Sequence, residues 1–381
     1  MKTNHKPVRV LIDANPIVVN KSGIGQFTYR LLESLAEQSK SSDSKLDITA
    51  YYFNFLGRKP TPDLPGSDVI SYKVVRFFPT KLLSVLHRLK LQLPLEFFLG
   101  LRRYDFLVFP NFVAVPTIRR TPYAVAVHDM AFIDKPEYLS DANRAYLERF
   151  VERSVRHCSA VLTISEFTKS RIVSHYKVDP SVVTVLPIPY EKPQHSGKVS
   201  DKIKDLIKKP YILYVGTIEP RKNLDGLLNA FAQTSESTRA DTQVIFAGGM
   251  GWKTEKITAA IESTKDKINL TLTGYISDTD RDYLYQYAAL VCIPSHYEGF
   301  GMQLLEAMYY KRKLLLSSIP VFHEVAGDYA TYCDIGNLKK FASTIEETLK
   351  KPAKQNAKVT NWTWQQNAET LTKEIIKRTS V

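Results

Sequence analysis

The chain has 381 residues, of which 44% are apolar and 24% charged, and its Lys and Arg residues outnumber its Asp and Glu residues by 52 to 39. A chain of this length is too long to form one ordinary hydrophobic core, so we predict two domains. The composition excludes a low-complexity or mostly disordered chain. The net charge of +13 favours an anionic partner, which a phosphorylated substrate, a membrane surface or a nucleic acid could each provide.

The first half of the sequence alternates between strand and helix patterns. Val8 to Ala14 predicts a buried strand, followed by a loop at Ser22-Gly23-Ile24-Gly25 and a helix from Gln26 to Gln38. Further strands are predicted at Leu46–Phe53, Phe106–Phe109, Tyr123–Val127 and Ala160–Ile164, and further helices at Arg144–Arg156 and Glu166–Tyr176. This alternation predicts a parallel sheet covered by helices.

The segment from Thr80 to Leu93 has the pattern of an amphipathic helix. Residues 80–120 contain seven Lys or Arg against two Asp or Glu. Such a helix can pack on the sheet, or it can lie on an anionic bilayer and collect a lipid-linked acceptor. The sequence leaves both interpretations open.

Prolines near Val185–Tyr190 and a lysine-rich stretch through Lys209 predict the domain boundary. A second alternating series follows, with strands at Tyr211–Val215, Gln243–Ala247, Ile268–Thr273 and Leu290–Pro294, and helices at Asn223–Ala232, Asp280–Ala288 and through Glu306. We therefore expect an α/β protein of two doubly wound Rossmann-like domains, 1–188 and 189–360, which face each other across a cleft. Residues 361–381 are expected to form a final helix that packs back on the first domain.

The three cysteines, Cys158, Cys292 and Cys333, are far apart and odd in number, so neither a disulfide framework nor a metal cluster is expected. The N-terminus lacks the apolar core of a signal peptide, and no stretch approaches the roughly 18 to 20 apolar residues that span a bilayer. We expect a cytoplasmic protein, with peripheral association at the inner face of the plasma membrane as a hypothesis.

Two motifs follow predicted strands of the first domain. Gly23 and Gly25 would let backbone N–H groups approach a phosphate at a helix start, although a simple tight turn explains them equally well. His128-Asp129 directly follows an apolar strand. That position favours contact between His128 and a transferred group over a purely structural histidine.

Two further motifs lie in the second domain. Gly216 ends a strand, and Arg221 and Lys222 precede a helix, where cations oppose the helix dipole and therefore indicate an anion site; surface solvation is the alternative. In the run from Ser295 to Ala307, Glu298 and Glu306 are eight residues apart across a glycine turn. Eight helical steps cover about 12 Å, which suits contacts at two ends of one elongated ligand.

Taken together, these motifs resemble family 4 of the retaining glycosyltransferases, whose members have the two-domain GT-B fold. Glu298 and Glu306 are similar to the two glutamates of the family's E-x7-E motif, and the Glu-Pro-Arg-Lys-Asn run at 219–223 resembles bacterial polysaccharide and O-antigen mannosyltransferases. The matching residues run in chain order from Gly23 to the double-glutamate segment, and their combination is specific although each motif alone is not.

The resemblance implies that Arg221 and Lys222 hold the leaving diphosphate, Glu306 binds the ribose, and Glu298 binds the sugar. His128 would contact the sugar, so the implied catalytic residues are His128, Arg221, Lys222 and Glu298. The implied donor contacts are Gly23, Gly25, Gly216, Arg221, Lys222, Tyr275, Ile276, Ser295, Glu298, Gly299, Phe300, Gly301, Met302 and Glu306. Tyr275 and Ile276 would lie beside the nucleobase. Both Lys222 and Glu298 are expected to be partly exposed in the cleft.

The implied reaction is a retaining, metal-independent transfer of a hexose to a glycan or lipid-linked acceptor, with no cofactor beyond the nucleotide-sugar. Mannose from GDP-mannose is the first choice, and UDP-sugars and deoxysugar donors remain open. Thr217 departs from the family, where many relatives have arginine, and the charge of Arg221 could replace it. The alternatives are another enzyme on this architecture, such as an epimerase, a hydrolase or a nicotinamide oxidoreductase, and a non-catalytic binding protein. The sequence lacks a nucleic-acid recognition motif, so no nucleic acid is expected as a partner.

Overall fold

The computed structural model of the chain describes residues 6–19, 23–40, 44–58, 62–79, 82, 85, 86, 91–100, 102–189, 197–354 and 362–379. The chain divides into two compact units. Unit 1 comprises Met1–Ile133, Asp141–Pro189 and Trp362–Val381, and unit 2 comprises Asp134–Ser140 and Tyr190–Asn361. The sequence analysis assigned residues 134–140 to the first domain, whereas their contacts place them in unit 2.

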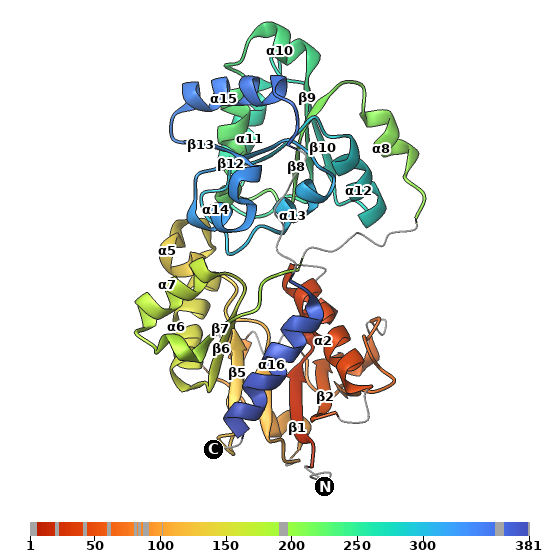
Figure 1. The fold of residues 1–381 in the computed structure, drawn as a ribbon, viewed down its shortest axis with the longest axis vertical. Helices are drawn as coiled ribbons and strands as arrows, with labels where there is room; N and C mark the ends of the chain where they lie inside the picture. Colours follow the sequence, from red (N-terminus) through yellow and green to blue (C-terminus); the bar gives the residue numbers. More distant parts are fainter. Residues whose placement is uncertain are drawn as a thin grey trace. The chain divides into compact units, whose positions relative to one another are not determined.

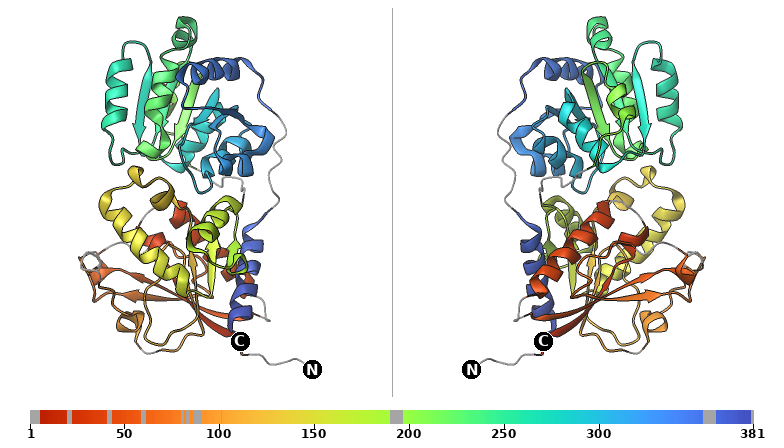
Figure 2. Two further views of the ribbon diagram at one scale, coloured as in Figure 1. Left: turned by 90° about the vertical axis from the view of Figure 1, so that its left-hand side faces the viewer. Right: turned by 90° about the vertical axis from the view of Figure 1, so that its right-hand side faces the viewer.

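Unit 1 is built on a seven-stranded parallel sheet within the described residues, in the order β3-β2-β1-β4-β5-β6-β7 (Figure 1). The strands are β1 (Val8–Asp13), β2 (Leu46–Phe53), β3 (Ser71–Val75), β4 (Phe106–Phe109), β5 (Tyr123–Ala126), β6 (Ala160–Thr163) and β7 (Val183–Val185). The helices are α1 (Asn15–Val19), α2 (Gly23–Ser39), α4 (Leu95–Leu99), α5 (Ala131–Asp134), α6 (Asp141–His157), α7 (Glu166–Tyr176) and α16 (Trp364–Thr379). Figure 2 shows helices on both faces of the sheet, which explains why the central strand β4 is apolar and buried along its whole length.

The final helix, α16, packs beside α2 in unit 1, as predicted. Its buried residues Trp364, Ala368, Leu371 and Ile375 recur at helical spacing and form one apolar face. The ring of Trp364 meets the ring of Phe27 of α2 edge to face, with centroids 5.6 Å apart. This apolar face is what attaches the C-terminal helix to the first unit.

Unit 2 contains a six-stranded parallel sheet within the described residues, in the order β10-β9-β8-β11-β12-β13. The strands are β8 (Tyr211–Val215), β9 (Gln243–Ala247), β10 (Leu270–Gly274), β11 (Leu290–Ile293), β12 (Leu314–Ser317) and β13 (Thr331–Cys333). The helices are α8 (Asp201–Leu206), α9 (Leu224–Phe231), α10 (Glu236–Asp241), α11 (Glu255–Thr264), α12 (Asp278–Tyr287), α13 (Met302–Tyr309), α14 (Pro320–Ala326) and α15 (Leu338–Lys350). The chain leaves β8 toward β9 on one side and returns to β11 on the other, so the strand order reverses between β8 and β11.

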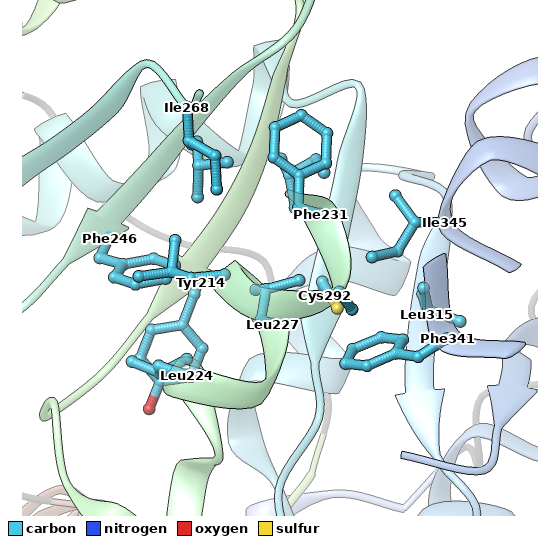
Figure 3. Packing of buried hydrophobic residues seen from close by; sticks show 14 of the residues in the cluster. Tyr214, Leu224, Leu227, Phe231, Phe246, Ile268, Cys292, Leu315, Phe341 and Ile345 are labelled. Carbon is cyan, nitrogen blue, oxygen red and sulfur yellow. The ribbon is translucent and has the colours of Figure 1, made fainter. Parts of the chain in front are cut away.

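The core of unit 2 holds helix α9 against the sheet (Figure 3). Leu224, Leu227 and Phe231 lie on one face of α9 and are each at most 2% exposed. They pack with Tyr214 of β8 and Phe246 of β9. Truncating such a buried residue to Ala typically lowers the free energy of unfolding by about 2 to 5 kcal/mol. This packing therefore fixes the start of α9 and the residues that come directly before the helix.

The predicted fold class is confirmed, and the differences include four strands and one helix start. Strands β3, β7, β12 and β13 were not predicted. Of these, β3, β7 and β13 are short edge strands whose residues are mostly half-buried, whereas β12 is a buried strand inside the sheet. Helix α2 begins at Gly23 rather than Gln26, so Gly23 and Gly25 lie in its first turn and not in a loop. The predicted helix Thr80–Leu93 falls mainly outside the described residues. Within the part of the chain that the structure describes, no helix is long and apolar enough to cross a membrane.

Candidate active site

The predicted motifs of the second domain meet at the carboxyl ends of β8 and β11. In open α/β sheets, ligands bind at this edge where the strand order reverses, and in unit 2 it reverses between these two strands. The loop at residues 216–223 follows β8, and the loop at residues 294–301 follows β11. The backbone N–H of His296 donates to the carbonyl of Arg221 over 2.8 Å, so the two loops are directly joined.

A buried cluster of charged side chains joins the two loops. The carboxylate of Glu298 accepts hydrogen bonds from the Arg221 guanidinium at 2.7 Å and the Lys222 ammonium at 2.5 Å. The Ser295 hydroxyl donates to the same carboxylate at 2.9 Å, and Glu219 forms a second ion pair with Arg221 at 2.8 Å. Glu219, Lys222 and Glu298 are each 6% exposed. The expectation that Lys222 and Glu298 are partly exposed is therefore wrong.

The electrostatics of the cluster fix its protonation. Burial alone would raise the pKa of Glu298, but the charges of Arg221 and Lys222 outweigh burial and lower that pKa to about 2. Burial and the neighbouring charge of Arg221 lower the pKa of Lys222, and the two glutamates only partly offset this. Glu298 is therefore ionised at neutral pH and can only accept hydrogen bonds.

The backbone conformation of each loop is set by a few residues. Pro220–Lys222 forms one turn of 3-10 helix with proline at its start, and Asn223 adopts a left-handed conformation (φ 53°) before α9 begins. Gly301 has φ 95° and directly precedes α13, and a Cβ atom there would lie 2.7 Å from Leu304 and 2.9 Å from Phe322. Only glycine fits at position 301 without moving the core.

Gly216 lies where two chain segments approach closely. Its φ is 140°, and a Cβ atom at the adjacent Gly248 would lie 2.0 Å from the Gly216 carbonyl oxygen. The side-chain amide of Gln303 on α13 donates to the carbonyl of Val215 over 3.0 Å. The missing side chain of Gly248 therefore lets the β9 loop approach the Gly216 carbonyl, and a Cβ atom at Gly216 would itself lie 2.9 Å from the Gln303 amide nitrogen of α13.

The second glutamate of the motif lies in a different environment. Glu298 is in the loop and Glu306 is on α13, so the helical spacing estimated from eight residues does not apply. Glu306 pairs with Arg281 of α12 at 3.2 Å, and its side chain is 22% exposed. Burial raises the pKa of Glu306, and the charge of Arg281 only partly offsets that effect.

The remaining predicted donor contacts of unit 2 lie after β10, after β11 and at the start of α13. Tyr275, which is 72% exposed, and the half-buried Ile276 follow β10. Ser295, Gly299 and Phe300 lie in the loop after β11 and are buried, and Met302 is the first residue of α13. These residues all belong to unit 2.

His128 is the predicted catalytic residue that belongs to unit 1. His128 follows β5, is 6% exposed, and its Nε2 atom lies 2.7 Å from the carbonyl oxygen of Pro110. Phe27 and Phe112 meet its ring edge to face. Burial lowers the pKa of His128, and the Pro110 carbonyl only partly offsets this. A carbonyl can only accept, so the ring is neutral with its proton on Nε2 and its lone pair on Nδ1.

Sequence reasoning missed several residues that build the site. Glu219 lies in the Glu-Pro-Arg-Lys-Asn run, but no function was predicted for it, although a glutamate next to two cations indicates an ion pair. Arg281, Gln303 and the segment Asp134–Ser140 gave no local signal, because their partners are distant in sequence. Among the described residues, no three His, Cys, Asp or Glu side chains are grouped so that they could hold a metal ion.

Comparison with known proteins identifies both halves of the chain. A family model described as Glycosyltransferase Family 4 matches residues 22–190, and one described as Glycosyl transferases group 1 matches residues 198–363. The chain is 27% identical to O-antigen chain mannosyltransferase B of Escherichia coli, covering 90% of this chain and 91% of that protein. It is also 27% identical to O-antigen chain mannosyltransferase RfbU of Salmonella typhimurium, covering 88% and 90%.

Solved structures share the fold. The crystal structure of WaaG, a glycosyltransferase involved in lipopolysaccharide biosynthesis, aligns with a TM-score of 0.61 at 14% identity, over 98% of this chain and 95% of WaaG. At that identity the likeness concerns the fold alone. The two family-model matches, to residues 22–190 and 198–363, together reach into both units.

Proposed function

We propose that this chain, which belongs to glycosyltransferase family 4, transfers mannose from GDP-mannose to a glycan or lipid-linked acceptor in cell-surface polysaccharide synthesis. The proposal includes retention of the anomeric configuration and a reaction that needs no metal ion. Relatives named as O-antigen mannosyltransferases over about nine tenths of both sequences support the sugar and the pathway class. A UDP-sugar or a deoxysugar donor is the alternative.

The observation that carries this proposal is the buried cluster of Arg221, Lys222 and Glu298. Its cations lie at the edge of the sheet where α/β domains bind ligands, and ion pairs with Glu298 fix the positions of both cationic side chains. Preorganised cations of this kind stabilise charge that develops on a leaving group without further rearrangement. A diphosphate is such a leaving group.

In the proposed reaction, the bond between the sugar C1 atom and the β-phosphate oxygen breaks while an acceptor hydroxyl attacks C1 from the same face. The acceptor proton passes to an oxygen of the departing diphosphate, so the products are the glycoside and GDP. Arg221 and Lys222 would counter the charge that builds on the diphosphate. Glu298, ionised at neutral pH, would accept hydrogen bonds from the sugar's hydroxyl groups.

The other predicted residues take supporting roles in this proposal. Glu306 would accept hydrogen bonds from the ribose, and Tyr275 with Ile276 would lie beside the base. Gly216, Gly299, Gly301 and the N–H groups from Phe300 to Met302 would approach the phosphates. His128, with its lone pair on Nδ1, would accept a hydrogen bond from the transferred sugar. Gly23 and Gly25, in the first turn of α2, would offer backbone N–H groups to the phosphates.

A surface feature of unit 1 supports peripheral binding to an anionic membrane, where a lipid-linked acceptor would be held. The exposed rings of Phe77 and Phe97 are in contact, with centroids 6.1 Å apart. Glu96 binds the backbone N–H groups of Ile118 and Arg119, which brings an exposed isoleucine (65%) and an arginine to the same helix. Exposed apolar side chains beside cations are typical of membrane-surface contacts. Flotation with anionic vesicles, but not with neutral ones, is the expected result.

The test of the proposed function is a thermal-shift and calorimetric screen against GDP, UDP, ADP, dTDP and their sugars, with magnesium or with EDTA. A ligand that binds only the folded state raises its apparent stability by an amount set by affinity. We expect GDP and GDP-mannose to raise the apparent stability of the wild type, each by the same amount with magnesium as with EDTA. Stabilisation by UDP alone would indicate a UDP-sugar donor instead of GDP-mannose. Nucleotide binding that depends on magnesium would refute the metal-independent reaction.

A further inference from the structure

The segment Asp134–Ser140 begins at the last residue of α5 and ends directly before α6, yet it is bound within unit 2. The indole N–H of Trp252 donates to the carbonyl of Tyr138 over 2.7 Å. The ammonium of Lys253 donates to the carbonyl of Leu139 at 2.7 Å and to that of Glu137 at 3.1 Å. Three consecutive carbonyls of the segment are therefore held by the loop that follows β9.

The same segment also binds the loop that carries Glu298. The Tyr297 hydroxyl donates to the carboxylate of Asp134 over 3.0 Å, and the Tyr297 side chain is nearly buried at 6% exposure. The ring of Tyr138 stacks on the ring of His296, with centroids 5.3 Å apart and planes 10° from parallel. His296 and Tyr297 are the two residues directly before Glu298.

These contacts bear on the charged cluster itself. The carbonyl of Tyr297 accepts a hydrogen bond from the Arg221 guanidinium at 2.7 Å, and the N–H of His296 donates to the Arg221 carbonyl. Ile218 in the loop after β8 exchanges backbone hydrogen bonds with Gly249 and Gly251 in the loop after β9. The segment thus binds the β9 and β11 loops directly, and through them it borders the β8 loop with both cations.

We propose that Asp134–Ser140 is a positioning segment of the donor site, which fixes the loop of Glu298 through the pairs Asp134–Tyr297 and Tyr138–His296. The inference rests on the proposed function, since it assigns these residues to nucleotide-sugar binding. The polar side-chain atoms of Asp134 and Tyr297 bind each other and would not contact the donor. Their hydrogen bond sets where the Tyr297 carbonyl and Glu298 lie relative to Arg221.

The test is a double-mutant cycle on ligand affinity in the full chain. Tyr297→Phe and Asp134→Ala each remove one end of the hydrogen bond, and calorimetric titration with GDP, and with UDP in parallel, measures the effect. We expect each single variant to weaken nucleotide binding roughly 5- to 20-fold and the double variant to be no worse than either single one, because coupled residues are not additive. Asp134→Asn, which keeps a carbonyl oxygen as acceptor, should restore most of the affinity.

A matched control separates positioning from general loss of stability. Tyr329→Phe removes a hydroxyl that donates to the Arg312 carbonyl over 2.9 Å, and Tyr329 is also 6% exposed. This control should lose some thermal stability and keep full GDP affinity. In turnover assays, Tyr297→Phe should raise KM for the donor more than it lowers kcat. Loss of a group that acts only in the transition state would instead lower kcat more than it raises KM.

The outcomes distinguish the two proposals. If the wild type binds a nucleoside diphosphate, and Tyr297→Phe and Asp134→Ala bind it equally well, the positioning role is refuted while the proposed function stands. Additive losses in the double variant, or no rescue by Asp134→Asn, would also overturn the assigned hydrogen bond. If the wild type binds none of the nucleotides, both the donor site and the segment's role in it are refuted.

Discussion

Replacing Glu298 by Gln takes one carboxylate out of a buried cluster that pairs it with Arg221 and Lys222. The pKa of Glu298 lies at about 2 instead of its ordinary 4.5, and each unit corresponds to about 1.4 kcal/mol, so the ionised state contributes about 3 kcal/mol to folding. Breaking a buried ion pair typically costs about 3 to 5 kcal/mol, which agrees with that value. For a unit of this size the expected drop in Tm is about 6 to 12 °C.

The assay is thermal and urea unfolding of ligand-free protein at pH 7, with an exposed pair as control. Glu347→Gln removes a carboxylate whose contact with Lys351 is 3.7 Å long and more than half exposed, and it should change stability by less than about 0.5 kcal/mol. The double variant Glu298→Gln, Lys222→Met removes one charge of each sign. It should therefore be more stable than Glu298→Gln alone.

The same reasoning predicts a pH dependence with a definite sign. The pKa of Glu298 is lowered in the folded protein, so its contribution is present above the ordinary value near 4.5 and is lost as the pH falls toward 2. The stability difference between wild type and Glu298→Gln should therefore shrink on acidification. A Tm loss below about 2 °C at pH 7, or a difference that stays constant down to pH 3, would refute the assigned electrostatics.

Three further predictions concern single positions. His128 should titrate below its ordinary pKa, because burial outweighs its carbonyl partner, and an NMR titration showing a protonated ring at pH 7 would contradict this. Gly301→Ala should lower the free energy of unfolding by about 2 to 4 kcal/mol in urea, whereas Gly249→Ala, where a Cβ meets no atom within 4 Å, should not. Thr217→Arg should tighten GDP binding roughly fivefold at low salt, because it adds an exposed cation beside Gly216, and Thr217→Gln should not. A gain that persists in 0.5 M salt would point to another cause.

Much of the fold follows from local patterns, and three of the four strands that were not predicted lie at sheet edges. The fourth, Leu314–Ser317, is a buried apolar run whose local pattern was overlooked. Tyr211–Val215 is an uninterrupted apolar run between Pro210 and Gly216, so its strand is defined by sequence alone. Ser71–Val75 contains Lys73 and lies at a sheet edge, where one side need not be apolar. The three-residue strand Thr331–Cys333 is also at an edge. Edge strands are recognised by their neighbours, which a single sequence does not reveal.

The site was predictable in its residue types and not in its pairing. Arg221, Lys222 and Glu298 stand out as charges at strand ends, but Lys222 and Glu298 are 76 residues apart and their contact is tertiary. The pair Asp134–Tyr297 spans 163 residues. Likewise, no local pattern indicates that the Arg221 guanidinium binds Glu298 and the Tyr297 carbonyl.

The two glutamates of the motif differ in a way that bears on the chemistry. A carboxylate with a pKa of about 2 is too weak a base to take a proton from a sugar hydroxyl at neutral pH, so Glu298 is suited to accepting hydrogen bonds and not to general base catalysis. Glu306, whose pKa is raised by burial, has one arginine partner and lies on α13, beyond the loop that holds Glu298. Environments that push two carboxyl groups apart in this way indicate separate roles. A Glu298 that does not act as the base agrees with the proposed reaction, in which the acceptor proton passes to the departing diphosphate.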